Sequence, residues 1–199
     1  MNREDRQHYY GVEINPSAKA FAEDKFVKHG VIDQIFTRTQ DIPSSLLFDV
    51  IYTTSVLEHV DAPLIELQTW RSKLAPDGML IVGLRNDGVD FAKQTFGYKD
   101  KDPNHHIYTW NSLLLANMID AAGYKTCNVI GQFDAWHSIE VGAYNADKYA
   151  YCLKSLDAGK ANKVYNMWAM AVHGDTGDCH SYKARADSIL ECKYLQESN

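Results

Sequence analysis

The sequence predicts an α/β fold: a doubly wound, mostly parallel sheet with helices packed against it. Strand-like apolar runs alternate with segments of helical periodicity along the chain. The runs at residues 48–54 and 79–84 are almost continuously apolar, which is typical of strands that a parallel sheet buries on both faces. The 199 residues fit a single domain, 1–199, with a core over about 9–131 and a C-terminal part, 132–199, that completes the sheet and adds helices.

The first predicted elements are a strand at residues 9–14, a helix, and a short strand at 34–37. Asn15 is a favourable N-cap residue, and Pro16 suits the first helical position. Gly30 provides a helix stop. Four apolar side chains recur at helical spacing between these signals and predict one packed face: Ala18, Phe21, Ala22 and Phe26.

The alternation continues through the middle of the chain. Asp61 is placed to cap a helix with Pro63 in its first turn, and Pro-Asp-Gly at residues 76–78 predicts a tight turn. Thr109 is placed to cap a further helix, which Gly123 ends. Beyond it, the pattern predicts strands at 124–130 and 164–172 and helices at 145–156 and 181–195.

The composition limits the classes of partner. The net charge is −6 and no run of five Lys or Arg residues occurs, so a nucleic-acid partner is not expected. No apolar stretch approaches the roughly 20 residues that span a bilayer, and no apolar region follows the charged N-terminus, so neither a membrane partner nor a signal peptide is expected. No cysteine pair has C-x-x-C spacing, and we expect a cytoplasmic protein with four reduced thiols: Cys127, Cys152, Cys179 and Cys192.

Three stretches carry a resemblance to a known family. Gly-Val-Glu-Ile-Asn-Pro at residues 11–16 places an acid at the end of a strand. Residues 48–60 lead from a strand into Leu-Glu-His-Val, and residues 74–84 combine Leu-Ala-Pro-Asp-Gly with another strand. His-His-Ile-Tyr-Thr-Trp at 105–110 precedes a helix that ends in Ala-Gly-Tyr. In these motifs the chain resembles the class I S-adenosylmethionine-dependent methyltransferases of small molecules, which implies a Rossmann-like methyltransferase fold.

The resemblance implies S-adenosylmethionine as the cofactor and a small molecule as the methyl acceptor. Glu13 stands where relatives have an acid that accepts hydrogen bonds from both ribose hydroxyls, a task that suits the two oxygens of a carboxylate. Thr39 and Gln40 would offer backbone groups near the adenine, and Ser55 would lie beside the methionine part. The complete set of implied cofactor-binding residues is Glu13, Ile14, Thr39, Gln40, Ser55, Leu57 and Glu58.

Two histidines are the candidate catalytic residues. Methyl transfer to a hydroxyl is helped by a general base, and histidine ordinarily titrates near neutral pH. His59 and His106 fit this role, and we expect both on the same rim of the sheet as Glu13. For each, the alternative is a structural histidine that closes a loop hydrogen bond. Residues 173–180 contain metal-capable side chains, but their spacing fits no zinc pattern, so no metal site is expected.

Other functions are open at this stage. The chain could be a non-catalytic methyltransferase-like binding module, because a fold does not fix a function. A nicotinamide oxidoreductase fits poorly, because the Leu-Glu-His-Val and turn motifs do not belong to that class. Titration with S-adenosylmethionine would distinguish a methyltransferase from a module.

The chain departs from the family at its start. The family's first strand and glycine-rich loop should precede Tyr9, but only eight residues do and none is Gly. Either the chain is truncated, with impaired cofactor binding, or the glycines near residues 171–178 form a permuted loop. Otherwise residues 164–172 are the family's last, antiparallel strand.

The absent strand would lie between the strands at 9–14 and 48–54. A buried backbone group left without a partner costs about 1–3 kcal/mol, so an open gap is unfavourable. We therefore expect direct pairing of these two strands, a strand from the C-terminal region, or a strand exchanged with another copy in a homodimer.

Overall fold

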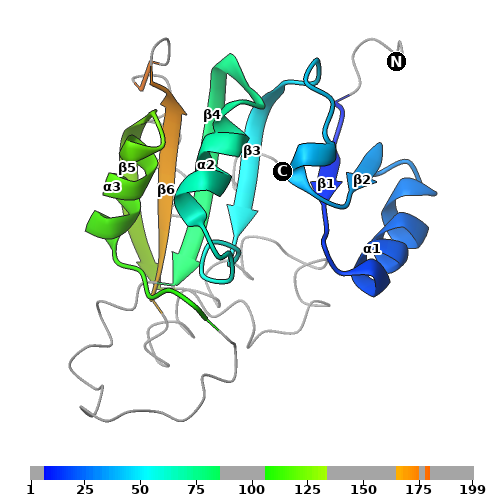
Figure 1. Ribbon diagram of the computed structural model, residues 1–199, viewed down its shortest axis with the longest axis horizontal. Helices are drawn as coiled ribbons and strands as arrows, with labels where there is room; N and C mark the ends of the chain where they lie inside the picture. The colour runs from blue at the N-terminus through cyan, green and yellow to red at the C-terminus, as the bar shows by residue number, and fades with distance from the viewer. Residues whose placement is uncertain (1–6, 86–105, 134–164, 175–177, 180–199) are drawn as a thin grey trace, which may run out of the picture. The chain divides into compact units, whose positions relative to one another are not determined.

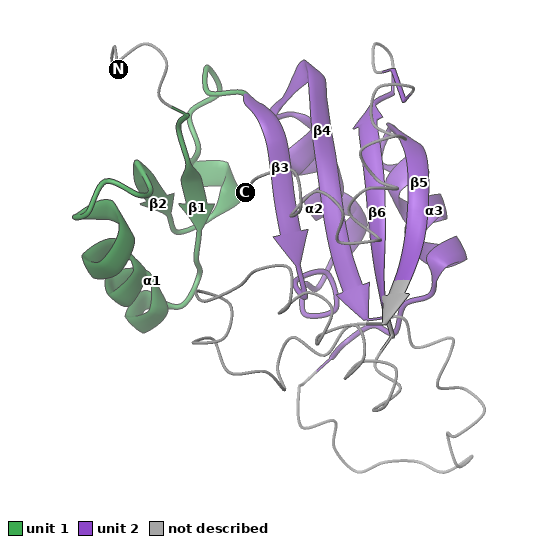
Figure 2. Ribbon diagram, turned by 180° about the vertical axis from the view of Figure 1, so that it is seen from behind, with its two compact units in different colours: residues 1–47 green, residues 48–199 purple. Residues whose placement is uncertain are grey.

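The structure is a computed structural model that describes residues 7–85, 106–133, 165–174 and 178–179. The chain divides into two compact units, Met1–Leu47 and Phe48–Asn199 (Figure 2). Both units combine helical segments with parallel strand pairs, so the predicted α/β class is confirmed. The helices predicted at 145–156 and 181–195 lie outside the described residues.

The first unit has a two-stranded parallel sheet and short helical segments. Strand β1 (Tyr10–Val12) pairs with β2 (Gln34–Phe36). Helix α1 (Pro16–Ala22) begins as predicted, because the Asn15 side chain accepts hydrogen bonds from the backbone N–H groups of the first turn at 2.9 and 3.1 Å. The single-turn π-helix η2 (Glu23–Val27) continues it.

The predicted apolar face of α1 is not buried. Neither α1 nor η2 contains a buried residue, and the side chains of Phe21 and Phe26 are 61% and 42% exposed. Gly30 follows with a φ of 68°, a left-handed conformation that favours glycine. A short 3₁₀ helix, η3 (Thr39–Asp41), comes after β2.

The second unit contains a four-stranded sheet in the order β3-β4-β6-β5 (Figure 1). Strand β3 (Phe48–Thr54) is parallel to β4 (Leu74–Arg85). Strand β6 (Tyr165–His173) inserts antiparallel between β4 and β5 (Tyr124–Phe133). The final antiparallel strand is therefore confirmed.

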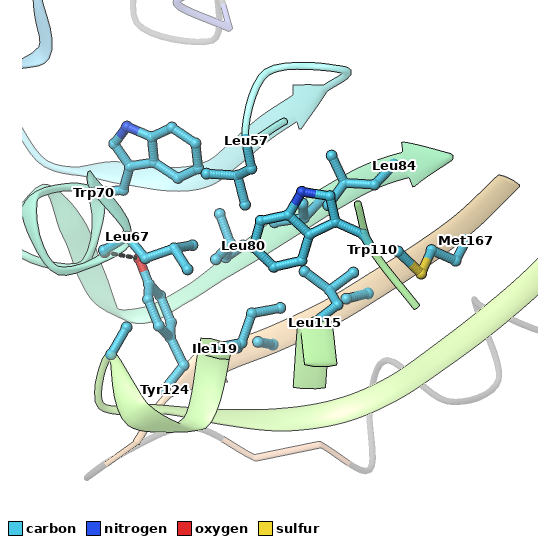
Figure 3. Close-up of a cluster of buried hydrophobic side chains, with 14 of the residues drawn as sticks. Leu57, Leu67, Trp70, Leu80, Leu84, Trp110, Leu115, Ile119, Tyr124 and Met167 are labelled. Carbon is cyan, nitrogen blue, oxygen red and sulfur yellow. Dashed lines mark hydrogen bonds between the residues drawn. The ribbon is translucent and has the colours of Figure 1, made fainter. Parts of the chain in front are cut away.

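Two helices, α2 (Pro63–Arg71) and α3 (Ser112–Ala121), lie on the same face of this sheet (Figures 1 and 2). Their apolar residues pack with alternate residues of β4 and β6 in one core cluster (Figure 3). The Tyr124 hydroxyl donates a hydrogen bond to the Leu67 carbonyl at 2.9 Å and joins the start of β5 to α2. In the described part of the chain, no helix is long and apolar enough to cross a membrane.

Three local predictions were wrong. The N-cap of α2 is Ala62, with no side-chain hydrogen bond, and not Asp61. The N-cap of α3 is Asn111, whose side chain accepts from Leu114 N at 2.9 Å, and not Thr109. The predicted turn at residues 76–78 lies within β4, where the ladder with β3 shifts its register.

A disulfide overturns the expectation that the cysteines are reduced. Cys127 and Cys179 are bonded, with their Cα atoms 5.2 Å apart. Cys127 lies where the ladder between β5 and β6 skips a residue, between Thr126 and Asn128. A residue at such a bulge has no opposite partner in the ladder. The other two cysteines lie outside the described residues.

Strands β1 and β3 belong to separate sheets, one in each unit. Strand β6 pairs with β4 and β5, and no described strand pairs with β3 on the side opposite β4. The predicted burial of β3 on both faces is also not observed, because Val50 and Tyr52 are 51% and 59% exposed. The three ways to fill the gap therefore stay predictions.

Candidate active site

The carboxyl end of β3 turns abruptly at Ser55. Its φ is 52°, and it is the one non-glycine residue with positive φ in the described part of the chain. The Ser55 N–H donates to the Gly83 carbonyl at 2.9 Å, which extends the ladder one residue beyond β3. A left-handed conformation costs a non-glycine residue roughly 1–2 kcal/mol. Such strain is concentrated at functional sites, which makes this turn a candidate site.

The next residues form a turn with two buried side chains and one exposed side chain. Leu57 is fully buried in the core cluster (Figure 3). Glu58 is also buried, with 5% of its surface exposed, whereas His59 is exposed. The His59 N–H donates to the Val56 carbonyl at 2.9 Å and closes the turn. The Leu57 side chain therefore anchors the loop, and only its backbone is available for the predicted cofactor contact.

A second segment is held against this turn. The Glu58 carbonyl accepts hydrogen bonds from the N–H groups of Ile107 and Tyr108 at 2.8 and 3.3 Å. The Tyr108 hydroxyl donates to the Asp61 carbonyl at 2.9 Å, and Trp110 is buried in the core. These contacts fix the backbone that carries His106. Tyr108 and Trp110 thus have structural roles in this part of the chain.

The two predicted catalytic histidines lie together. The ring centroids of His59 and His106 are 5.0 Å apart, with 51° between their planes. One potential ligand atom from each of Glu58, His59 and His106 lies within 4.8 Å of the other two. A buried carboxylate needs a hydrogen-bonding or charged partner, and imidazoles supply both. We call these three residues the Glu–His–His cluster.

Glu13 lies immediately after β1 in the first unit. Its N–H donates to the Phe36 carbonyl at 3.0 Å, and its carboxylate Oε1 accepts from Asn15 N at 2.7 Å. The other carboxylate oxygen accepts no hydrogen bond from the described residues. Glu13 therefore keeps acceptor capacity for a ribose hydroxyl, as its predicted role requires. The adjacent Ile14 side chain is 75% exposed.

The remaining predicted cofactor residues of this unit lie on η3. Thr39 is buried and Gln40 is exposed. The Asp41 carboxylate accepts from Arg38 N at 3.0 Å, so it holds the loop in shape. The sequence identified these residues only through the resemblance.

Glu13, Thr39 and Gln40 belong to the first unit, and the Glu–His–His cluster belongs to the second. Each group is thus described within its own unit. The expectation that Glu13 shares a rim with His59 and His106 stays a prediction.

Comparisons with known proteins identify the fold. Structures of an S-adenosylmethionine-dependent methyltransferase from Clostridium acetobutylicum and a SAM-dependent methyltransferase from Aquifex aeolicus are similar to this chain. The first is 10% identical with a TM-score of 0.54, covering 84% of this chain and 76% of that one. The second is 16% identical with a TM-score of 0.50, covering 84% and 69%. A Bacillus halodurans protein described as a methyltransferase is 12% identical, with a TM-score of 0.55 over 83% and 82%. No curated protein sequence matches the chain.

The class is therefore that of α/β proteins with the Rossmann-like methyltransferase fold. The sequence family of methyltransferase domains matches residues 1–129, which is more than half of the chain. The chain belongs to this family. The predicted class of enzyme, an S-adenosylmethionine-dependent methyltransferase, is confirmed, and S-adenosylmethionine is the cofactor of this class.

Proposed function

We propose that this chain methylates a hydroxyl oxygen of a small molecule and that the Glu–His–His cluster activates that hydroxyl. The observation that carries the proposal is the pairing of His59 and His106, 5.0 Å apart, beside the buried Glu58. When bound, S-adenosylmethionine supplies a methyl group on a positively charged sulfur. The C–O bond forms as the C–S bond breaks, the electron pair goes to sulfur, and the hydroxyl proton goes to an imidazole nitrogen.

The exposed histidine of the pair is the better placed general base. His59 is exposed to incoming acceptor, whereas His106 is half-buried and held through its neighbours Ile107 and Tyr108. The Glu58 carboxylate has the position of an orienting group, which holds an imidazole in one tautomer and offsets the charge that proton transfer creates. A positioned general base contributes about 10²–10⁴-fold to a rate.

We propose cofactor-binding roles for residues of each unit, taken separately. Glu13 accepts hydrogen bonds from the ribose, Ile14 lies beside it, and the backbone of Thr39 and Gln40 contacts the adenine. The turn after β3 contributes Ser55, the Leu57 backbone and Glu58. Two facts support this assignment: the acceptor capacity of Glu13 and the family match across residues 1–129, which includes parts of both units. A single methyltransferase domain over residues 1–199 stays part of the proposal, and the match supports it over residues 1–129.

The test of cofactor binding is a calorimetric titration with S-adenosylmethionine. Glu13→Gln keeps the shape of the side chain but removes its charge, so affinity is expected to fall at least tenfold. Glu23→Gln is the control, because Glu23 pairs with Lys19 in the same unit and has no proposed contact. Equal affinity for both variants would remove Glu13 from the site.

The test of catalysis measures S-adenosylhomocysteine formation against hydroxyl, amine and thiol acceptors. His59→Ala and His106→Ala are expected to lower kcat about 10²–10⁴-fold for a hydroxyl acceptor, with unchanged cofactor affinity. His29→Ala, at an exposed histidine of the first unit, serves as the control. Full turnover in both site variants, or turnover confined to amines, would reject the proposal.

A homodimer is also part of the proposal, and the cytoplasmic location expected from the sequence is the part that the disulfide counts against. The unpaired side of β3 in the described sheet supports association. Light scattering at several concentrations tests it. The Cys127–Cys179 bond bears against a reducing compartment, where disulfides are rare. Thiol labelling of the protein in its native cells, before any exposure to oxidant, tests the location. Four free thiols would support the cytoplasm, and fewer would count against it.

A further inference from the structure

The side chains of the Glu–His–His cluster are suited to bind a metal ion as well as to act as a general base. Its three side chains come from two segments that are far apart in the sequence, which is why the spacing of the residues gave no sign of it. No other group of three such residues occurs in the part of the chain that the structure describes. We propose that Glu58, His59 and His106 bind a divalent transition-metal ion, with Zn²⁺ the best match.

The distances allow closure onto an ion. Ligand atoms at 2.0–2.2 Å from a tetrahedral zinc lie roughly 3.3 Å from one another. The ligand atoms of the cluster lie within 4.8 Å of one another, so the widest pair needs to close by roughly 1.5 Å. The His59 side chain is exposed, and its backbone is held in the turn by the hydrogen bond to Val56. Its ring can therefore approach the other two ligands by side-chain rotation, without displacing packed groups.

The backbone around the cluster is already fixed. Two hydrogen bonds from Ile107 and Tyr108 to the Glu58 carbonyl join the segment that carries His106 to the turn that carries His59. The buried Leu57 side chain and the hydrogen bond from Tyr108 to Asp61 anchor the same two segments. Metal ligands on rigid backbones lose little conformational freedom when they bind.

The donor set selects the type of metal. Two imidazoles and one carboxylate are the ligands of catalytic zinc sites, which keep the fourth position open. Calcium and magnesium prefer sites made entirely of oxygen, so they fit less well. Coordination of the Glu58 carboxylate to Zn²⁺ would pair this buried negative charge with a positive one and so offset the cost of burying it.

The inference rests on the proposed function for its acceptor, because a hydroxyl is the group that the open position would take. A hydroxyl oxygen bound to zinc loses its proton more readily, and with both imidazoles engaged as ligands the proton passes to solvent water. The metal would then activate the same acceptor that the metal-free cluster activates by direct proton transfer.

Zinc binding is tested on the whole chain without cofactor or acceptor. The protein is stripped with a chelator and titrated with ZnCl₂ in competition with a chromophoric zinc indicator. Cysteines and histidines outside the described residues can also bind zinc. The quantity to compare is therefore the zinc affinity that is lost when each cluster residue is substituted. Glu58→Gln, His59→Ala and His106→Ala are each expected to weaken that site at least tenfold.

Asp61→Asn and His29→Ala are the matched controls, since Asp61 is an exposed carboxylate in the same loop and His29 is an exposed histidine elsewhere. Both are expected to bind zinc as the parent chain does. His59→Ala is the decisive variant, because substitution of an exposed side chain leaves the folded state intact where Glu58→Gln could disturb it. Affinity of His59→Ala equal to that of the parent overturns the proposal, and so does a parent that binds no zinc.

The two proposals fail separately. Loss of turnover in the histidine variants, with no zinc site in the parent, rejects the metal and leaves the proposed methylation standing. A zinc site that these variants remove, in a chain that methylates no hydroxyl, upholds the metal and rejects the methylation.

Discussion

The close approach of Trp168 to Gly83 gives the sharpest prediction of stability. A Cβ atom on Gly83 would lie 2.3 Å from Cζ3 of Trp168 and 2.7 Å from both Cε3 and Cη2. Carbon atoms in contact lie about 3.5 Å apart, so in Gly83→Ala the indole must retreat by roughly 1.2 Å. The ring also stacks on Tyr52, with centroids 6.1 Å apart. Overpacking of this kind lowers the free energy of unfolding by about 1–3 kcal/mol.

Urea unfolding followed by circular dichroism measures this loss, as a lower midpoint at an unchanged slope. Gly11→Ala is the matched control. It also adds one methyl group to a strand glycine, but the nearest atom, Cγ1 of Ile35, lies 3.6 Å away at an ordinary contact distance. Its free energy of unfolding is expected to stay within about 0.5 kcal/mol of the parent value.

The same substitution in a Trp168→Leu protein shows whether the indole ring causes the loss of stability. In Trp168→Leu the six-membered ring is absent, so adding Gly83→Ala there should cost at least about 1 kcal/mol less than in the parent. Additive effects of the two substitutions, or a Gly83→Ala variant as stable as the parent, would refute the reasoning.

Three other predictions concern single contacts, each measured by urea unfolding. Ser55→Gly should raise the free energy of unfolding by roughly 0.5–1 kcal/mol by relieving the φ of 52°, whereas Thr54→Gly, in extended backbone, should lower it. Tyr124→Phe removes the hydrogen bond to the Leu67 carbonyl and should cost about 0.5–1.5 kcal/mol. Burial raises the pKa of Tyr124 above its ordinary value of 10.0, so the folded state favours the protonated phenol. The parent should therefore lose stability as pH rises above 10.0, and Tyr124→Phe should lose less; parallel curves would contradict this assignment. Asn111→Ala removes the side-chain cap of α3 and should cost about 1 kcal/mol, and no change would show that the cap is dispensable.

Strong local signals predicted parts of the fold well. Strand β3 has the predicted bounds, and its apolar run ends at Thr53 and Thr54 on the C-terminal side. Asn15 and Pro16 located the start of α1, since capping and proline geometry act within one turn. Asp61 and Thr109 are not the caps, since α2 and α3 are capped one and two residues later, by Ala62 and Asn111. Local capping preferences locate a helix start only to within one or two residues.

The site depended on information that is not local. The resemblance proposed His59 and His106, but their mutual distance follows from the hydrogen bonds between their segments. The sequence assigned Glu58 to the cofactor, and the structure adds its position beside both imidazoles. The bond between Cys127 and Cys179 had no sequence signature, because its partners lie 52 residues apart without a spacing motif.

The place of β6 in the sheet has a consequence for synthesis of the protein. It separates β4 from β5, yet the ribosome reaches it about 80 residues after the end of β4. At about 5–20 residues per second, that delay is roughly 4–16 s. During this delay, the edge of β4 that later pairs with β6 has no neighbouring strand in the nascent chain. The time during which the new chain is most open to aggregation or chaperone capture is therefore set by how quickly translation delivers its central strand.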